Sequence, residues 1–399
     1  MIKILSVFGT RPEAIKMAPL IQGMAARHTD FTSQVCVTAQ HRQMLDQVLN
    51  LFRIIPDYDL DVMEENQSPT QVLAAVLSRL EPILQKERPD WVLVQGDTTS
   101  TVAAALAAFH SGAKVAHVEA GLRTGDKRQP FPEEVNRRVT SLIADLHFAP
   151  TEQSRRNLLD EGVPENRILV TGNTIIDALR WALQHQPSPE ISAPPRPISS
   201  NKATPSERPL VKDNTGQTEQ NDSNWSGRAP RLILVTAHRR ENFGQPLENI
   251  CVALRAIARD YKEQIHIVLP VHPNPNIGGL IRRMLGDLPN VTLLPPLNYV
   301  SIAHLLDKSY LVVTDSGGLQ EEAASLGKPV LVTRKVTDRP ESVEAGTARV
   351  VGIESETIAK EIVNLLDNAE AYQAMVKAEN IYGDGQASAR IINAFLGFY

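Results

Sequence analysis

Cysteine is nearly absent from this sequence of 399 residues, which has only Cys36 and Cys251. The two lie far apart and outside any C-x-x-C or His-rich motif, so neither a disulfide framework nor a structural zinc site is indicated, and we expect no bound metal. No apolar run approaches the ~20 residues that a membrane-spanning helix requires, and the first residues lack the features of a signal peptide. We therefore expect a cytoplasmic protein without a membrane partner.

The sequence also has no excess of positive charge. Its formal net charge is -5, and no basic stripe interleaved with aromatic residues occurs, so we expect no nucleic-acid partner. The first glycine turn, at Gly9, does not have the G-x-G-x-x-G spacing of dinucleotide-binding proteins. This absence argues against NAD, and we expect no cofactor.

The sequence does contain a regular succession of short runs of Val, Ile and Leu. Each is followed by a Gly- or Thr-containing turn and a helical pattern, which is typical of parallel strands in βα units. A chain of 399 residues also exceeds the ~250 to 300 at which one hydrophobic core usually stops growing. We therefore predict an α/β protein with two Rossmann-like, doubly wound domains. The predicted strands are 2–7, 34–38, 91–94, 114–118, 147–149, 168–170, 232–236, 265–271, 291–294, 311–314, 330–333 and 349–351.

The segment 186–230 loses this periodicity and is rich in Pro, Ser, Asn and Thr. Such a composition buries too little apolar surface to offset the entropy lost on ordering, so we interpret it as a mobile linker. It separates a predicted domain 1–185 from a second domain 231–375. The remaining 376–399 are expected to form a C-terminal helix that packs back on the first domain. This organisation predicts a glycosyltransferase-B-like arrangement with a cleft between the domains.

Two cations follow the first predicted strand. Arg11 stands at the entrance of a helix that begins near Pro12, and Lys16 lies one turn further on. Beside the free N–H groups of a helix start they would suit a diphosphate. A solvated Arg and Lys on a helix end is the alternative.

Acidic residues follow other predicted strands. Asp97 and Glu119 stand at the carboxyl ends of parallel strands, where ligands bind in open α/β sheets. Asp97 could equally be an N-cap for a helix near Thr99. After Glu119, by contrast, Gly121 and a polar stretch delay the next helix, so Glu119 has no helix to cap and a functional role is favoured. Glu133 and Arg137 share a helix face at i, i+4, which on this spacing alone favours a surface ion pair.

In the second half, His238 follows the first predicted strand next to two arginines, and His272 follows the second; a lone histidine such as His272 is usually structural. The most informative motif is Thr314 to Glu322, a strand, then Ser316-Gly317-Gly318, then a helix. The glycines would let the backbone approach an anion at the helix N-terminus. Glu321 could serve only the helix dipole, while Glu322, one turn in, could accept hydrogen bonds from ribose hydroxyls.

With these motifs the sequence resembles the non-hydrolysing UDP-N-acetylglucosamine 2-epimerases of bacteria. The resemblance runs from Phe8 to the segment Tyr382 to Ala387 and fails only across the linker. The blocks that carry it are 8–19, 37–48, 96–99, 117–124, 132–137, 172–178, 236–242, 314–322 and 339–341.

The resemblance implies a role for most of the residues singled out above. Asp97, Glu119 and Glu133 would handle protons, with His238 as a further catalytic residue, and Glu322 would bind the ribose. The residues implied to bind the substrate or its diphosphate are Arg11, Lys16, Asp97, Glu119, Arg137, His238, Ser316, Gly317, Gly318 and Arg339. The implied partners are UDP-GlcNAc and UDP-ManNAc, and a second copy of the chain in a homodimer.

Some positions depart from the family pattern or belong to a second site. Gln40, Gln43 and His272 match residues implicated in allosteric binding of UDP-GlcNAc, but Asn66 replaces an arginine of regulated members. Ile302 replaces an aromatic residue near the uracil, and Leu297 belongs to the same base-contacting loop. Asp338 replaces a glutamate.

The chemistry that the resemblance implies explains the need for these residues. C2 of an N-acetylhexosamine has no adjacent carbonyl, so a carboxylate cannot remove its proton unaided. Anti elimination of UDP would give 2-acetamidoglucal, and re-addition after protonation from the other face would give the epimer. Such a reaction needs cations on the departing diphosphate, two proton-handling groups and a closed site. The alternatives are a glycosyltransferase of the same scaffold, a hydrolysing epimerase and a nucleotide-sugar sensor.

Overall fold

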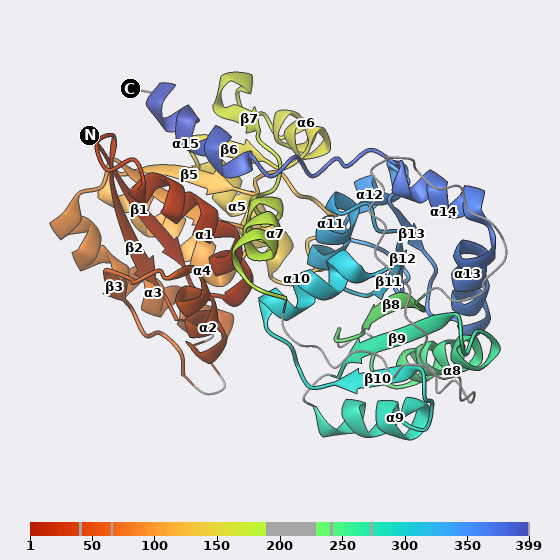
Figure 1. Ribbon diagram of the computed structural model, residues 1–399. Coiled ribbons are helices and arrows are strands. Elements are labelled where there is room, and N and C mark those ends of the chain that lie inside the picture. The colour runs from red at the N-terminus through yellow and green to blue at the C-terminus, as the bar shows by residue number, and fades with distance from the viewer. Residues whose placement is uncertain (40–41, 65–66, 189–228, 240–241, 272–273, 398–399) are drawn as a thin grey trace, which may run out of the picture.

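The computed structural model describes residues 1–39, 42–64, 67–188, 229–239, 242–271 and 274–397. The first parallel sheet has the order β3-β2-β1-β4-β5-β6-β7 (Figure 1). Its strands are β1 (Ile2–Phe8), β2 (Phe31–Val37), β3 (Tyr58–Asp59), β4 (Trp91–Gln95), β5 (Lys114–Val118), β6 (Leu146–Ala149) and β7 (Ile168–Val170). Six of these were predicted, and the two-residue β3 was missed because it has no apolar run.

The second parallel sheet has the order β10-β9-β8-β11-β12-β13. In both sheets the order reverses between the first strand of the half and the fourth, as in doubly wound folds. The predicted α/β class with two Rossmann-like halves is therefore confirmed. The strands are β8 (Arg231–Thr236), β9 (Ile265–Pro270), β10 (Val291–Leu294), β11 (Leu311–Thr314), β12 (Val330–Val332) and β13 (Ala348–Val350).

Helices cover both faces of each sheet, which is why the strands are apolar on both sides. In β1, Ile4 and Phe8 belong to one buried cluster and Leu5 and Val7 to another, as the two-residue period of a strand requires. The helices are α1 (Arg11–Ala25), α2 (Arg42–Phe52), α3 (Pro69–Glu87), α4 (Thr99–Ser111), α5 (Glu133–Ile143), α6 (Glu152–Asp160), α7 (Thr174–His185), α8 (Gln245–Asp260), α9 (Pro275–Leu285), α10 (Tyr299–Lys308), α11 (Gly317–Ser325), α12 (Pro340–Glu344), α13 (Ser355–Asp367), α14 (Ala369–Val376) and α15 (Ala387–Gly397), with a 3-10 turn at Glu165–Arg167.

The end of the chain returns to the first sheet (Figure 1). Helix α15 packs against α1 and α7, and the buried ring of Phe395 lies 5.4 Å from Trp91 and 5.7 Å from Phe148, centroid to centroid. The helix begins at Ala387 rather than at 376, after two left-handed glycines, Gly383 and Gly385. We call the first sheet, its helices and α15 the first lobe, and the second sheet with its helices the second lobe.

The lobes meet where α7 packs against α10 and α11. The segment 186–230 proposed as a linker lies, for 189–228, outside the described residues, and the domain boundaries stay predictions. No helix in the described part of the chain is long and apolar enough to cross a membrane.

Candidate active site

The turns after β1 and β4 are joined by a buried carboxylate. Glu13 accepts hydrogen bonds from the N–H groups of Gly9 and Thr10 at 2.9 and 2.7 Å, and from the hydroxyls of Thr98 and Thr101 at 2.6 and 2.8 Å. Because β1 and β4 are neighbours in the sheet, this one side chain fixes both turns. Glu13 was not predicted as a site residue, although its spacing of three residues from Thr10 is that of a capping box.

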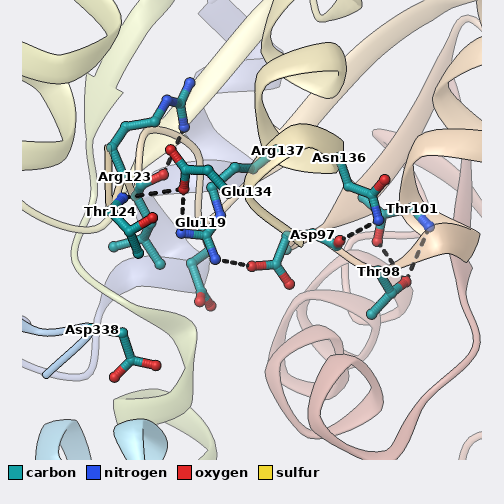
Figure 2. A network of polar contacts seen from close by, with 12 residues as sticks. Asp97, Thr98, Thr101, Glu119, Arg123, Thr124, Glu134, Asn136, Arg137 and Asp338 are labelled. Atoms are coloured by element: carbon teal, nitrogen blue, oxygen red, sulfur yellow. Dashed lines mark hydrogen bonds and ion pairs between the residues drawn. The ribbon is translucent and has the colours of Figure 1, made fainter. Parts of the chain in front are cut away.

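Asp97 lies in the turn after β4 and does not cap the following helix. The N-cap of α4 is Thr98, whose hydroxyl accepts from the N–H of Thr101 at 3.1 Å. The Asp97 carboxylate instead contacts the guanidinium of Arg137, and its backbone carbonyl accepts from Asn136 at 3.0 Å (Figure 2). The capping alternative is therefore wrong, and the acidic side chain is held next to α5 while 28% of it stays exposed.

Helix α5 presents two adjacent carboxylates in different environments. Glu134 is fully buried, and Arg137 pairs with it at 3.2 Å and with Asp97, so the expected surface pair between Glu133 and Arg137 is wrong. Glu133 is half-buried, and within the described part of the chain its Oε2 atom is buried without a hydrogen-bond partner. Burial raises the pKa of Glu133, and the nearby Asp97 carboxylate raises it further. No feature of the sequence distinguishes Glu134 as the structural partner.

Glu119 follows β5 and has a backbone φ of 64°, a left-handed conformation that is uncommon outside glycine. Its buried carboxylate accepts hydrogen bonds from Lys16 and, at 2.8 Å, from Gln95, and lies 3.8 Å from Nη2 of Arg339. Burial alone would raise the pKa of Glu119, but the charges of Lys16 and Arg339 outweigh burial and lower it. Lys16 is therefore not a solvated cation at the helix start, as one alternative had it, but the buried partner of Glu119.

In the second lobe, Asp315 joins the turns after β8 and β11. Its fully buried carboxylate accepts from the N–H groups of His238 and Arg239, both at 2.9 Å, and from the Asn242 amide at 3.0 Å. Nδ1 of His238 lies 3.0 Å from the other carboxylate oxygen, while the ring itself is half exposed. Asp315 thus orients His238, and the rule that singled out Asp97, an acid directly after a strand, would have found it.

The Ser-Gly-Gly turn begins α11 as predicted, with Ser316 as N-cap. The two glycines differ in their surroundings. A Cβ at Gly317 would lie 2.9 Å from the Asp338 carboxylate, whereas one at Gly318 would meet nothing within 4 Å. Asp338 in turn pairs with Arg239 at 3.0 Å and Arg334 at 3.1 Å. Burial alone would raise the pKa of Asp338, but the neighbouring arginines hold it at about 2.

The adjacent glutamates of α11 are both buried. Glu321 accepts from Arg339 and, at 2.7 Å, from the Asn173 amide, so the interpretation that it serves only the helix dipole is wrong. One oxygen of Glu322 has no hydrogen-bond partner among the residues that the structure describes, and burial raises the pKa of this carboxyl to about 7. Arg11, at the start of α1 in the other lobe, acts on Glu322 electrostatically.

The lobes face each other across this region. A cavity of about 200 Å³ is lined by residues of both, among them Arg123 and Asp338, but Asp97, Glu119, Glu133 and His238 are not among its lining residues. Leu297 and Ile302 are half-buried before and within the first turn of α10 and pack against an apolar cluster of the second lobe. The proposed allosteric residues Gln40 and His272, the side chain of Gln43, and Asn66 lie outside the described residues. Among the described residues, no group of three or more His, Cys, Asp or Glu side chains is placed to hold a metal ion.

The comparison with known proteins agrees with this geometry. Residues 24–396 match the family model described as UDP-N-acetylglucosamine 2-epimerase. The chain belongs to this family. It is 48% identical to the UDP-N-acetylglucosamine 2-epimerase of Salmonella typhimurium over 99% of both chains. It is also similar to the crystal structure of the Neisseria meningitidis epimerase bound to UDP-GlcNAc, with a TM-score of 0.84, 44% identity, and coverage of 99% of this chain and 100% of that one.

A more distant likeness concerns the fold alone. The structure of this epimerase-family chain is similar to that of MurG from Acinetobacter baumannii, with a TM-score of 0.60 and 14% identity over the full length of both chains. MurG has the glycosyltransferase-B fold, so the predicted glycosyltransferase-B-like arrangement of the two halves is confirmed.

Proposed function

We propose that this chain catalyses the reversible inversion of C2 that converts UDP-GlcNAc into UDP-ManNAc. In the proposed reaction the bond between C1 and the diphosphate breaks while a side chain removes the C2 proton from the opposite face. The intermediates are UDP and 2-acetamidoglucal. A second group then protonates C2 from the other face, and the return of UDP to C1 completes the epimerisation without hydrolysis.

The observation that carries the proposal is that Asp97, Glu119 and Glu133 lie at one edge of the first sheet, where Arg137 contacts Asp97 and acts electrostatically on the other two. The pKa of Glu119 is lowered by its cations, while burial raises the pKa of Glu133. A reaction that removes one proton and supplies another needs one ionised and one protonated group, and environments that separate two pKa values provide them. This supports Glu133 as proton donor, with Asp97 or Glu119 as acceptor.

The proposal also assigns residues that stabilise UDP as it leaves C1. The departing UDP gains negative charge, so cations and unpaired N–H groups at the diphosphate stabilise the transition state. The start of α11 at Ser316, Gly317 and Gly318 and the ring of His238 supply these in the second lobe, and Arg11 and Lys16 in the first. Glu322 would accept hydrogen bonds from the ribose, with Arg339 and Arg137 nearby. A homodimer, and allosteric binding at Gln40, Gln43 and His272, stay predictions.

The test is proton NMR of UDP-GlcNAc incubated with the protein in heavy water without any acceptor. The proposal predicts UDP-ManNAc in equilibrium with UDP-GlcNAc, with deuterium at C2 of both. Accumulation of free ManNAc and UDP would show a hydrolysing enzyme instead. If the substrate stays unchanged until an acceptor is added, the chain is a glycosyltransferase, and if it stays unchanged in every mixture, the proposal of an enzyme fails.

A further inference from the structure

Four buried charges from both lobes form one contact chain. Lys16 donates to Glu119, Arg339 lies 3.8 Å from the other oxygen of Glu119, and Nε of Arg339 donates to Glu321. None of the four residues is more than 9% exposed. Lys16 and Glu119 belong to the first lobe, and Glu321 and Arg339 to the second. With all four ionised their charges sum to zero.

The chain of contacts continues to the place where the backbone passes between the lobes. The amide of Asn173 donates to the second oxygen of Glu321 at 2.7 Å, and its own oxygen caps α7 by accepting from Ile175 at 3.2 Å. The N–H of Asn173 donates to the carbonyl of Tyr382 at 2.8 Å. Gly172 and Gly383 lie so close there that a Cβ on either would come within about 3.2 Å of the backbone of the other. Asn173 thus ties Glu321 to the crossing point.

In this series of contacts, the neighbours of each group determine whether it donates or accepts a hydrogen bond. The Asn173 oxygen is used by the helix cap, so only its N–H group can face Glu321. Glu321 must then accept on both sides, from Asn173 and from Arg339. Buried charges that lose a partner are strongly destabilised, so the position of Arg339 against Glu119 depends on Glu321, which accepts from its Nε.

We propose that Glu321 and Asn173 are positioning residues of the reaction: across the lobe boundary they hold Arg339 against Glu119. The set of charged partners around Glu119 in the first lobe is thereby complete only when the second lobe is in place. Both side chains are buried, and each acts on the reaction through Arg339. The inference rests on the proposed function, since it concerns the arrangement of Glu119 for that reaction.

The experiment uses the variants Glu321→Gln, Asn173→Asp and the double variant, with kcat and KM for UDP-GlcNAc as readouts. In Glu321→Gln the new amide N–H faces the Asn173 N–H, and in Asn173→Asp two carboxylates face each other. We expect each single variant to lower kcat by roughly 10- to 100-fold, as loss of a supporting partner typically does, with KM and the Kd of UDP changed less than about threefold. In the double variant the introduced amide would donate to the introduced carboxylate and the charge sum returns to zero, so kcat should recover by about tenfold or more.

Glu87→Gln is the matched control, because Glu87 pairs with Lys3 at 2.7 Å at the far edge of the first sheet; its kcat should equal that of the wild type. Single variants with wild-type kcat would overturn the inference, as would a double variant no better than the singles. If a single variant does not fold, the double variant decides: kcat within tenfold of the wild type supports the inference, and a lower value overturns it. A wild-type protein that forms no UDP-ManNAc would instead defeat the proposed function.

Discussion

The carboxylate of Asp315 lies 3.0 Å from Nδ1 of His238 and also accepts the backbone N–H of the same residue at 2.9 Å. Ring and backbone of the histidine are thus held by one buried side chain, which leaves Nε2 as the nitrogen available to a ligand. Burial alone would raise the pKa of Asp315, but the ring of His238 and the backbone N–H groups of His238 and Arg239 together outweigh burial and lower it. Asp315 is therefore anionic at neutral pH.

Asp315→Asn should impair His238 without removing it. An amide cannot accept from the histidine ring and from three other donors at once, so we expect kcat to fall about 10- to 100-fold. The free energy of unfolding should fall by about 1 to 3 kcal/mol because buried N–H groups lose an acceptor. Steady-state kinetics and urea unfolding measure the two effects. Asp287→Asn, which breaks an exposed pair with Arg255, is the control, and equal behaviour of the two variants would contradict the role of Asp315.

Glu322 predicts a pH dependence of stability. Burial raises its pKa from 4.5 in the unfolded chain to about 7 in the folded one. Between these values the native state binds more protons than the unfolded state, so the stabilising contribution is complete below pH 4.5 and is lost as pH rises through about 7. The contribution is on the order of 3 kcal/mol. Thermal unfolding from pH 5 to 8 should show a steeper loss of Tm for the wild type than for Glu322→Gln, and parallel curves would contradict this.

The two glycines of the turn should respond differently to alanine. A Cβ at Gly317 would press on the Asp338 carboxylate, which pairs with Arg239 and Arg334. We expect Gly317→Ala to cost about 1 to 3 kcal/mol of unfolding free energy, whereas Gly318→Ala, with open space around it, should be neutral or stabilise by about 0.4 to 1 kcal/mol. Urea unfolding compares them directly, and equal destabilisation of both would show that the packing of Asp338 is not the cause.

The sequence predicted the fold well because parallel strands buried on both faces read as unbroken apolar runs. The strand Tyr58–Asp59 was not predicted, because two residues, one of them charged, form no apolar run. Within the site, the sequence could predict only the residues that directly follow a strand. On this basis Asp97 and Glu119 were placed correctly at the carboxyl edge of the first sheet.

The partners of these residues could not be predicted. Glu321 accepts a hydrogen bond from Asn173, which is 148 residues away in the sequence, and Lys16 donates to Glu119, which is 103 residues away. Such pairs depend on how segments far apart in the sequence fold against each other, within a lobe or across the two, and no local spacing encodes them. The same reason explains why Glu133 was assigned a surface pair with Arg137, when Arg137 turns to Asp97, 40 residues away.

Exchange of the C2 hydrogen in Asp97→Asn and Glu119→Gln tests the central claim most directly, which is that first-lobe carboxylates move protons on a sugar whose nucleotide is held by the second lobe. UDP-GlcNAc in heavy water is followed by proton NMR, with UDP affinity measured in parallel. The account predicts that both variants still bind UDP but incorporate deuterium at C2 at least about 100-fold more slowly than the wild type. Exchange at the wild-type rate in both variants would contradict it.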